Sequence, residues 1–395
     1  MKTFVGALVS FAFALNGAIA GDFPFAEASN RYSIRLLKSL DNKEQGNVCF
    51  SPVVSLVLVA QLYAGLDART REVIRQEMDW RDDGEAVHDG YAALMKEIPE
   101  SVFSTSFQFF TQKGVQFSEP YEDILKKYST RLSIVDWTDG RVDLKAETIN
   151  ESLSQFSKGR IARLLSRERL EQAIESHLEV RSAPIVPVSA LKMQLTLNKT
   201  DEPTHLVFHH SDGKSEIVNG ARSVRDFKIL RVESGLEMVE LEFQEKGFVV
   251  DFILPPRASS LSKFVSHLTP ELLTHYLSRL EKTSGQISFP SLRMQSSLSV
   301  YKGLPENVRW READTRRMGD PGEFRTIGMA DISQDFWFDL SGKGTEAAAA
   351  AVLTIGGART LVIYPEYFSV NRPHLVIIRS LKTGAYLMLA KVLSP

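Results

Sequence analysis

The sequence predicts an α+β fold, and two observations support this prediction. Apolar residues recur at helical spacing in the first half of the chain, whereas the second half contains runs rich in Val, Phe and Ile. Helices that precede antiparallel-looking strands are typical of an α+β fold and not of a regular βαβ alternation. The composition is even, without a Pro/Ser-rich linker or charge block, so we expect one large domain over residues 21–395.

Helical patterns run through the first half of the chain. The first covers residues 25–40 and the second covers residues 52–64, where Pro52 suits a first helical turn and Gly65 suits its exit. Further helices are expected at residues 70–78 and 143–165.

Strand-forming residues dominate the second half. Runs of Val, Phe and Ile predict strands at residues 238–243 and 248–254, and two more near the end at residues 375–378 and 387–392. Between these pairs, residues 261–280 return to a helical pattern. Near the middle, His209 and His210 stand beside a turn-like segment and are interpreted as part of a surface hairpin.

The first twenty residues predict a secretory signal peptide. Lys2 is followed by an apolar stretch over residues 4–15 and then by the small residues Ala18 and Ala20. Cleavage after Ala20 would leave a mature chain that begins at Gly21. Because the apolar stretch is too short for a stable anchor, we expect a secreted, extracellular protein with no membrane span.

Charge and cysteine content argue against several classes of protein. The formal net charge is -2, so we expect no general attraction to nucleic acid or anionic lipid. Cys49 is the single cysteine, which excludes an internal disulfide, and its apolar neighbours predict a small buried residue. We find no H-E-x-x-H, C-x-x-C pair, G-x-S-x-G elbow or P-loop. We therefore expect no enzyme activity, metal or cofactor. We also expect the protein to be a monomer.

Two N-glycosylation sequons occur in the chain. Asn198 lies among polar, turn-like residues and is the preferred acceptor, because such segments lie at the surface. Asn150 lies inside a helical pattern, where its side chain has a structural alternative.

An alanine-rich segment from Gly342 to Ala351 allows three interpretations. Gly342, Gly344 and Ala347 match a G-x-G-x-x-A dinucleotide fingerprint, but too little chain follows for a doubly wound sheet. Alanine's helix propensity favours an ordinary surface helix. The preferred interpretation is a segment that can become an added strand of an existing sheet, because small side chains without proline can enter between two existing strands.

In β geometry, this segment has two unequal faces. Thr345, Ala347, Ala349 and Ala351 would lie on one face, and Glu346, Ala348 and Ala350 on the other. Glu346 is the charged residue of the stretch, so one face carries only small and uncharged side chains.

These residues resemble the hinge of inhibitory serpins. The segment Gly344-Thr345-Glu346-Ala347-Ala348-Ala349-Ala350-Ala351 is similar to that hinge, and Asn47-Val48-Cys49-Phe50-Ser51-Pro52 resembles the family's N-x-x-F-S-P motif. Residues 148–161 and 369–392, the latter with Asn371-Arg372-Pro373, resemble further serpin segments. The resemblance covers nearly the whole mature chain.

The resemblance implies a serpin fold, in which helices pack on three β-sheets and a large central sheet accepts the reactive loop, here about residues 342–370. It also implies a metastable protein whose exposed loop is cut by a serine protease while covalently attached to it. The loop then inserts into the sheet and distorts the protease before the acyl bond hydrolyses.

The resemblance leaves two candidates for the scissile bond. Counting along the hinge places the cut after Ala358, which would suit elastase-like proteases. A hydroxyl residue after the cut favours the Arg359–Thr360 bond, which would suit trypsin-like proteases. We prefer Arg359.

Several residues depart from the family pattern. Ser189 stands at a usual asparagine, Leu197 at a tryptophan and Gln334 at a histidine. Val54 replaces a serine, and an expected Lys–Glu ion pair is absent on both sides, at Ser291 and Gly342. The intact hinge from Gly344 to Ala351 makes an extracellular serine-protease inhibitor the leading hypothesis. The departures motivate the alternative, a non-inhibitory serpin that serves as a binding or carrier protein.

Overall fold

A computed structural model describes residues 23–42, 46–157, 167–197, 201–300, 304, 313–329, 332–340 and 366–395. Its helices are α1 (Pro24–Asp41), α2 (Pro52–Ala64), α3 (Ala68–Glu77), α4 (Glu85–Lys96), α5 (Glu119–Lys127), the 3-10 helix η1 (Trp137–Asp139), α6 (Val142–Ser157), α7 (Arg167–Leu178), α8 (Leu261–His267) and α9 (Pro270–Ser278).

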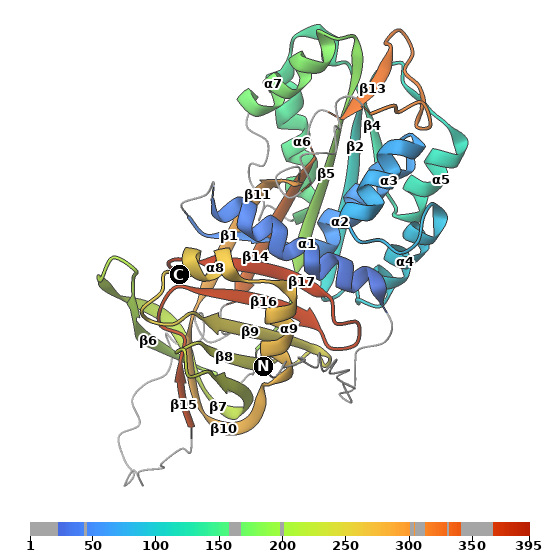
Figure 1. Cartoon of the computed structure of the whole chain (residues 1–395). Helices are drawn as coiled ribbons and strands as arrows, with labels where there is room; N and C mark the ends of the chain where they lie inside the picture. The colour runs from blue at the N-terminus through green and yellow to red at the C-terminus, as the bar shows by residue number, and fades with distance from the viewer. Residues whose placement is uncertain are drawn as a thin grey trace, which may run out of the picture.

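The described strands form three sheets (Figure 1). The nine-stranded sheet contains β1 (Val48–Phe50), β6 (Glu202–His209), β7 (Ser215–Arg231), β8 (Glu237–Glu242), β9 (Phe248–Leu254), β10 (Glu281–Pro290), β15 (Glu366–Ser369), β16 (His374–Ser380) and β17 (Tyr386–Val392). The six-stranded sheet contains β2 (Phe103–Gln112), β4 (Arg131–Val135), β5 (Ser182–Met193), β11 (Leu292–Ser299), β13 (Thr326–Met329) and β14 (Ser333–Leu340). A short pair joins β3 (Gln116–Phe117) to β12 (Gly319–Asp320).

The order of elements confirms the α+β prediction. The expected helices and strands appear as α1, α2, α3, α6, β8, β9, β16 and β17, with small shifts at their ends. Residues 158–165 of the expected helix lie outside the described residues. The hairpin at His209 is confirmed, because His209 pairs with Ser215 at the turn between β6 and β7.

The helical pattern at residues 261–280 is divided in the structure. It forms α8 and α9, which are separated by Leu268 and Thr269. Pro270 occupies the first turn of α9, where its missing N–H costs nothing, whereas inside a continuous helix it would remove a hydrogen bond and clash. The Thr269 hydroxyl accepts a hydrogen bond from the Leu272 N–H at 3.1 Å and so caps the new helix.

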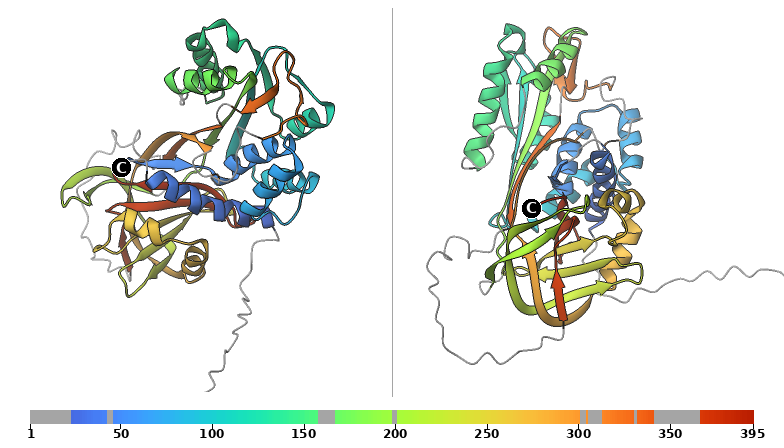
Figure 2. Two further views of the ribbon diagram at one scale, coloured as in Figure 1. Left: turned by 45° about the horizontal axis from the view of Figure 1, so that its top comes forward. Right: turned by 90° about the vertical axis from the view of Figure 1, so that its left-hand side faces the viewer.

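Helices cover both faces of the six-stranded sheet (Figure 2). On one face, α6 and α7 bury an apolar cluster against β2 and β5. On the other face, α2 packs against β5 as part of the main core, which continues into the nine-stranded sheet. Strand β5 is therefore buried on both sides.

Candidate functional site

The candidate site is the boundary between β14 and β5, which we call the seam. The two strands are parallel neighbours, and their paired residues run from Ser333 with Val188 to Trp337 with Lys192. Their other long pairings are antiparallel, β14 with β11 and β5 with β2. Parallel pairing is slightly less stable per residue, so a strand that ran antiparallel to both would be accommodated well here.

The predicted reactive loop starts at the end of a seam strand. Strand β14 ends at Leu340, and the chain is next described at Glu366 in β15, a parallel partner of β10 in the other large sheet. The loop segment therefore connects the two sheets. The hinge residues Gly344 to Ala351 and the scissile-bond candidates Ala358, Arg359 and Thr360 lie outside the described residues, and so does Gly342.

Gln334 fastens β14 to the start of α2 beneath the seam. Its Nε2 donates to the Ser51 carbonyl at 2.9 Å and to Ser55 Oγ at 3.1 Å. Its Oε1 accepts the Ser51 N–H at 2.8 Å, and all three residues are fully buried. Because an amide both donates and accepts, Gln334 satisfies several buried polar groups at once.

This cluster was visible in the sequence only as a departure at Gln334. The partners Ser51 and Ser55 are 283 and 279 residues away in the chain, so no local pattern pairs them with Gln334. Ser51 also caps the N-terminus of α2, because its Oγ accepts the Val54 N–H at 3.4 Å.

The other departures occupy different surroundings. Ser189 Oγ donates to the Ser333 carbonyl across the seam at 3.5 Å, the outer limit for a hydrogen bond. Val54 and Leu197 are buried in the core. Ser291 donates its N–H to the Asn219 carbonyl at 2.9 Å, while its buried hydroxyl has no partner among the described residues.

Arg231 holds the strand at which the loop segment ends. Its guanidinium lies 2.6 Å from the Glu366 carboxylate and donates to the Tyr367 carbonyl at 3.2 Å. It also lies 6.0 Å from the Phe368 ring and 3.3 Å from Glu237. These contacts fix the short edge strand β15 to the nine-stranded sheet.

The remaining predicted site residues lie apart from the seam. Asn150 lies on α6, two residues before Ser152, whose hydroxyl donates to Gln108 Oε1 at 2.8 Å. Asn198, Ala20 and Gly21 lie outside the described residues. Cys49 is fully buried, as expected, and burial raises the pKa of its thiol.

Neither metal sites nor membrane helices emerge from the described part of the chain. No three His, Cys, Asp or Glu side chains in it are grouped to hold a metal ion. No helix within the described ranges has the length and apolar character needed to cross a membrane.

Comparison with known proteins identifies the family. The family model described as "Serpin (serine protease inhibitor)" matches residues 27–395, so the chain belongs to the serpin family. Antithrombin-III of Ovis aries is 27% identical over 387 residues, covering 94% of this chain and 81% of that protein. Serpin B6 of Pongo abelii is 22% identical, covering 94% of this chain and 99% of that protein.

Solved structures confirm the serpin fold. Serpin48 of the insect Tenebrio molitor is similar with a TM-score of 0.76 at 18% identity, covering 95% of this chain and 99% of that one. The mouse protein-Z dependent protease inhibitor is similar with a TM-score of 0.77 at 15% identity, covering 94% and 97%.

Proposed function

We propose that the protein is an extracellular serine-protease inhibitor that acts by loop cleavage, covalent trapping and strand insertion. The seam is the observation that carries this proposal. Strand β14 pairs in parallel with β5 and leads directly into the alanine-rich hinge segment. A chain that turned back after Leu340 would run antiparallel to both seam strands and would need side chains as small as those of residues 347–351.

Trapping depends on a race between two steps. The serine oxygen of the protease attacks the carbonyl carbon of the scissile residue, the peptide C–N bond breaks and the new amine leaves with a proton. The loop remains joined to the protease through an ester. If the hinge inserts into the seam before water hydrolyses that ester, the protease is carried away and distorted; otherwise the inhibitor is consumed as a substrate.

The target class follows from the scissile bond. Cleavage of the Arg359–Thr360 bond suits a trypsin-like protease with an acidic specificity pocket, and this is the bond that we favour. Cleavage after Ala358 suits an elastase-like protease with a small pocket.

Extracellular action is supported by the first residues of the chain. Residues 1–20 carry the signal-peptide pattern with its cut between Ala20 and Gly21, and a secreted chain would meet the glycosylation machinery at Asn198 and Asn150. Sequencing the N-terminus of the protein from culture medium tests this part: Gly21 is expected, and a retained Met1 would contradict it.

Incubation with trypsin and with pancreatic elastase tests the mechanism. We expect a complex that survives denaturation, a new N-terminus at Thr360 or at Arg359, and a large rise in the melting temperature of the cut protein. A protease whose serine is chemically blocked is the control and should give no complex. Cleavage without a complex and with an unchanged melting temperature would overturn the proposal.

A cavity favours the alternative function of a binding or carrier protein. It has a volume of about 750 Å³ and lies between α1 and α9. Asn30 and Arg31 of α1, Thr274 and His275 of α9, and Tyr386 of β17 contribute to its wall. Such a volume suits a small molecule. Cleavage without trapping in the preceding experiment is the result that this alternative predicts.

A further inference from the structure

The apolar cluster under helix α6 spans the seam on its outer face. Its apolar residues Val142, Ala146, Ile149 and Leu153 are buried in one cluster with Phe110 of β2 and with Val186, Val188 and Ala190 of β5. Trp337 of β14 packs against the same cluster from the other side of the seam. A strand inserted between β5 and β14 would separate these strands by about 4.8 Å more and would place its outward side chains under this cluster.

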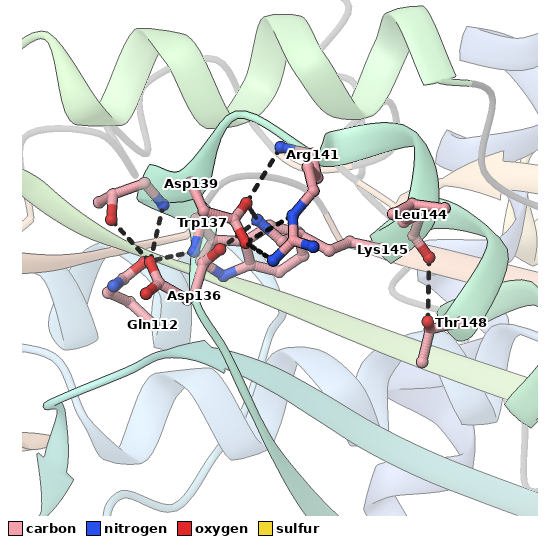
Figure 3. A network of polar contacts seen from close by, with 9 residues as sticks. Gln112, Asp136, Trp137, Asp139, Arg141, Leu144, Lys145 and Thr148 are labelled. Carbon is pink, nitrogen blue, oxygen red and sulfur yellow. Dashed lines mark hydrogen bonds and ion pairs between the residues drawn. The ribbon is translucent and has the colours of Figure 1, made fainter.

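The N-terminal end of α6 is held by a network that centres on Lys145 (Figure 3). The Lys145 ammonium donates to the Asp136 carbonyl and to the Asp139 carboxylate, and it lies 5.9 Å from the Trp137 ring. Asp139 also accepts the Arg141 N–H at 3.0 Å. We call Asp136, Trp137, Asp139 and Lys145 the α6 latch.

Two polar attachments of α6 lead to β2, on the far side of β5 from β14. The latch reaches β2 through the Trp137 N–H, which donates to Gln112 Oε1 at 2.9 Å. The second attachment is the hydrogen bond from Ser152 to Gln108. Since the strand order is β14-β5-β2-β4, these bonds lie beside the seam, whereas the contact with Trp337 crosses it.

The ion pair of the latch is partly shielded from solvent, and its carboxylate is charged. The Lys145 side chain is only 12% exposed and Asp139 is 27% exposed, so their ion pair is shielded more than most surface pairs. Hydrogen bonds from Lys145 and from the Arg141 N–H hold the pKa of Asp139 well below its usual range. The carboxylate therefore stays charged throughout the physiological pH range.

We propose that the α6 latch sets the rate of strand insertion by holding α6 across the seam. This inference rests on the proposed function. Insertion requires α6 to lift or slide off the space beside β5, and Asp139 and Lys145 are positioning residues that resist this movement. Loosening the latch speeds insertion without touching the loop or the protease.

Substitution of Lys145 tests the latch. Lys145→Met keeps the apolar stem and removes the charge, whereas Lys145→Arg keeps the cation as a rescue variant. Lys126→Met on α5 is the matched control, because Lys126 forms an exposed ion pair with Asp123 at 3.0 Å and lies on another helix. Asp139→Asn tests the latch from its other side if Lys145→Met does not fold.

Insertion is followed with a dye on the variant Gly356→Cys, since the buried Cys49 remains unlabelled. The protein is mixed with excess trypsin or elastase, and the fluorescence change gives the insertion rate. We expect a rate about fivefold higher for Lys145→Met, equivalent to about 1 kcal/mol, with the native rate for Lys145→Arg and Lys126→Met. Hydrogen exchange over residues 142–157 of the uncut Lys145→Met protein should also increase.

The outcomes separate the two proposals. If the native protein traps protease and Lys145→Met inserts at the native rate, the latch is overturned and the inhibitory mechanism stands. If the native protein forms no complex with either protease, the proposed function fails and the latch fails with it.

Discussion

The two large sheets differ in how their neighbouring strands are joined. In the nine-stranded sheet, the neighbouring strands β7, β8, β9, β16 and β17 pair antiparallel, and buried ion pairs link β8, β9 and β16. Arg379 of β16 contacts Asp251 of β9 at 2.6 Å and Glu240 of β8. In the six-stranded sheet, β14 and β5 pair in parallel, and the Ser189–Ser333 hydrogen bond across them is 3.5 Å long.

This difference indicates a division of labour. The ion pairs of the nine-stranded sheet are costly to separate, so that sheet is expected to remain intact throughout the proposed inhibitory cycle. If a strand enters the seam, the parallel pairing of β14 with β5 is lost, and each of these strands gains an antiparallel pairing with the inserted strand. The predictions below test this contrast, from the largest expected effect to the smallest.

Thr345→Arg is expected to convert the inhibitor into a substrate. A long charged side chain would have to enter the sheet interior, and burying it without a partner is costly. We expect the trapped fraction to fall at least about tenfold, which corresponds to about 1.4 kcal/mol in the competition between insertion and hydrolysis. Denaturing gels after incubation with protease measure this fraction. Thr345→Ser is the control, and full trapping by Thr345→Arg would contradict insertion of the hinge.

Arg379→Met is expected to destabilise the nine-stranded sheet. It leaves the carboxylates of Asp251 and Glu240 buried without their guanidinium, at a cost of about 3–5 kcal/mol. The unfolding midpoint in denaturant measures the loss. Arg293→Met is the control, because its ion pair with Asp339 is exposed and worth about 0–1 kcal/mol. Equal effects of the two substitutions would remove the contrast between the sheets.

Gln334→Leu is expected to weaken the attachment of β14 to α2. It leaves the Ser51 N–H and Ser55 Oγ without this buried partner, which costs about 1–3 kcal/mol. The melting temperature of the uncut protein should fall accordingly. Gln334→His restores a side chain that both donates and accepts, so it should recover part of the loss. An unchanged melting temperature in Gln334→Leu would show that the cluster does not hold the seam strand.

Acid is expected to destabilise the protein through two buried histidines. Burial lowers the pKa of His88 and of His374 to about 4. Between pH 6.5 and 4 the unfolded chain binds protons that the folded chain does not, so stability falls as the pH falls through this window. The slope is at most about 1.4 kcal/mol per pH unit for each histidine, and above pH 6.5 they contribute none.

His374→Phe separates this effect from other titrations. The His374 ring lies 5.8 Å from the Phe252 ring and 6.4 Å from the Phe208 ring, so an aromatic replacement suits its surroundings. We expect a shallower loss of melting temperature between pH 7 and pH 5 than in the native protein. The exposed His205→Gln variant is the control, and an identical pH profile in all three proteins would refute the assignment.

Strand β5 shows why part of the fold escapes prediction from sequence. Both of its faces are covered, so its residues lack the alternation that reveals a half-buried strand. Pro184 and Pro187 also lie within it, and proline argues against a central strand. By contrast, runs rich in Val, Ile and Phe predicted β8, β9, β16 and β17, and Pro52 and Gly65 marked the two ends of α2.

The candidate site was partly predictable. The hinge pattern predicts a reactive loop from about residue 342, and this stays a prediction because those residues lie outside the described ones. The register of the seam follows from tertiary pairing between residues far apart in sequence. The α6 latch had no local signal beyond scattered charges, because its members matter only once η1 folds back over the end of β2.

The location of the hinge in the cut protein tests the inhibitory mechanism most directly. A crystal structure of the protein after cleavage by trypsin or elastase should show residues 345–351 between β14 and β5, antiparallel to both. If Ser333 to Trp337 remain paired with Val188 to Lys192 in the cut molecule, the loop does not enter the seam and the mechanism is wrong.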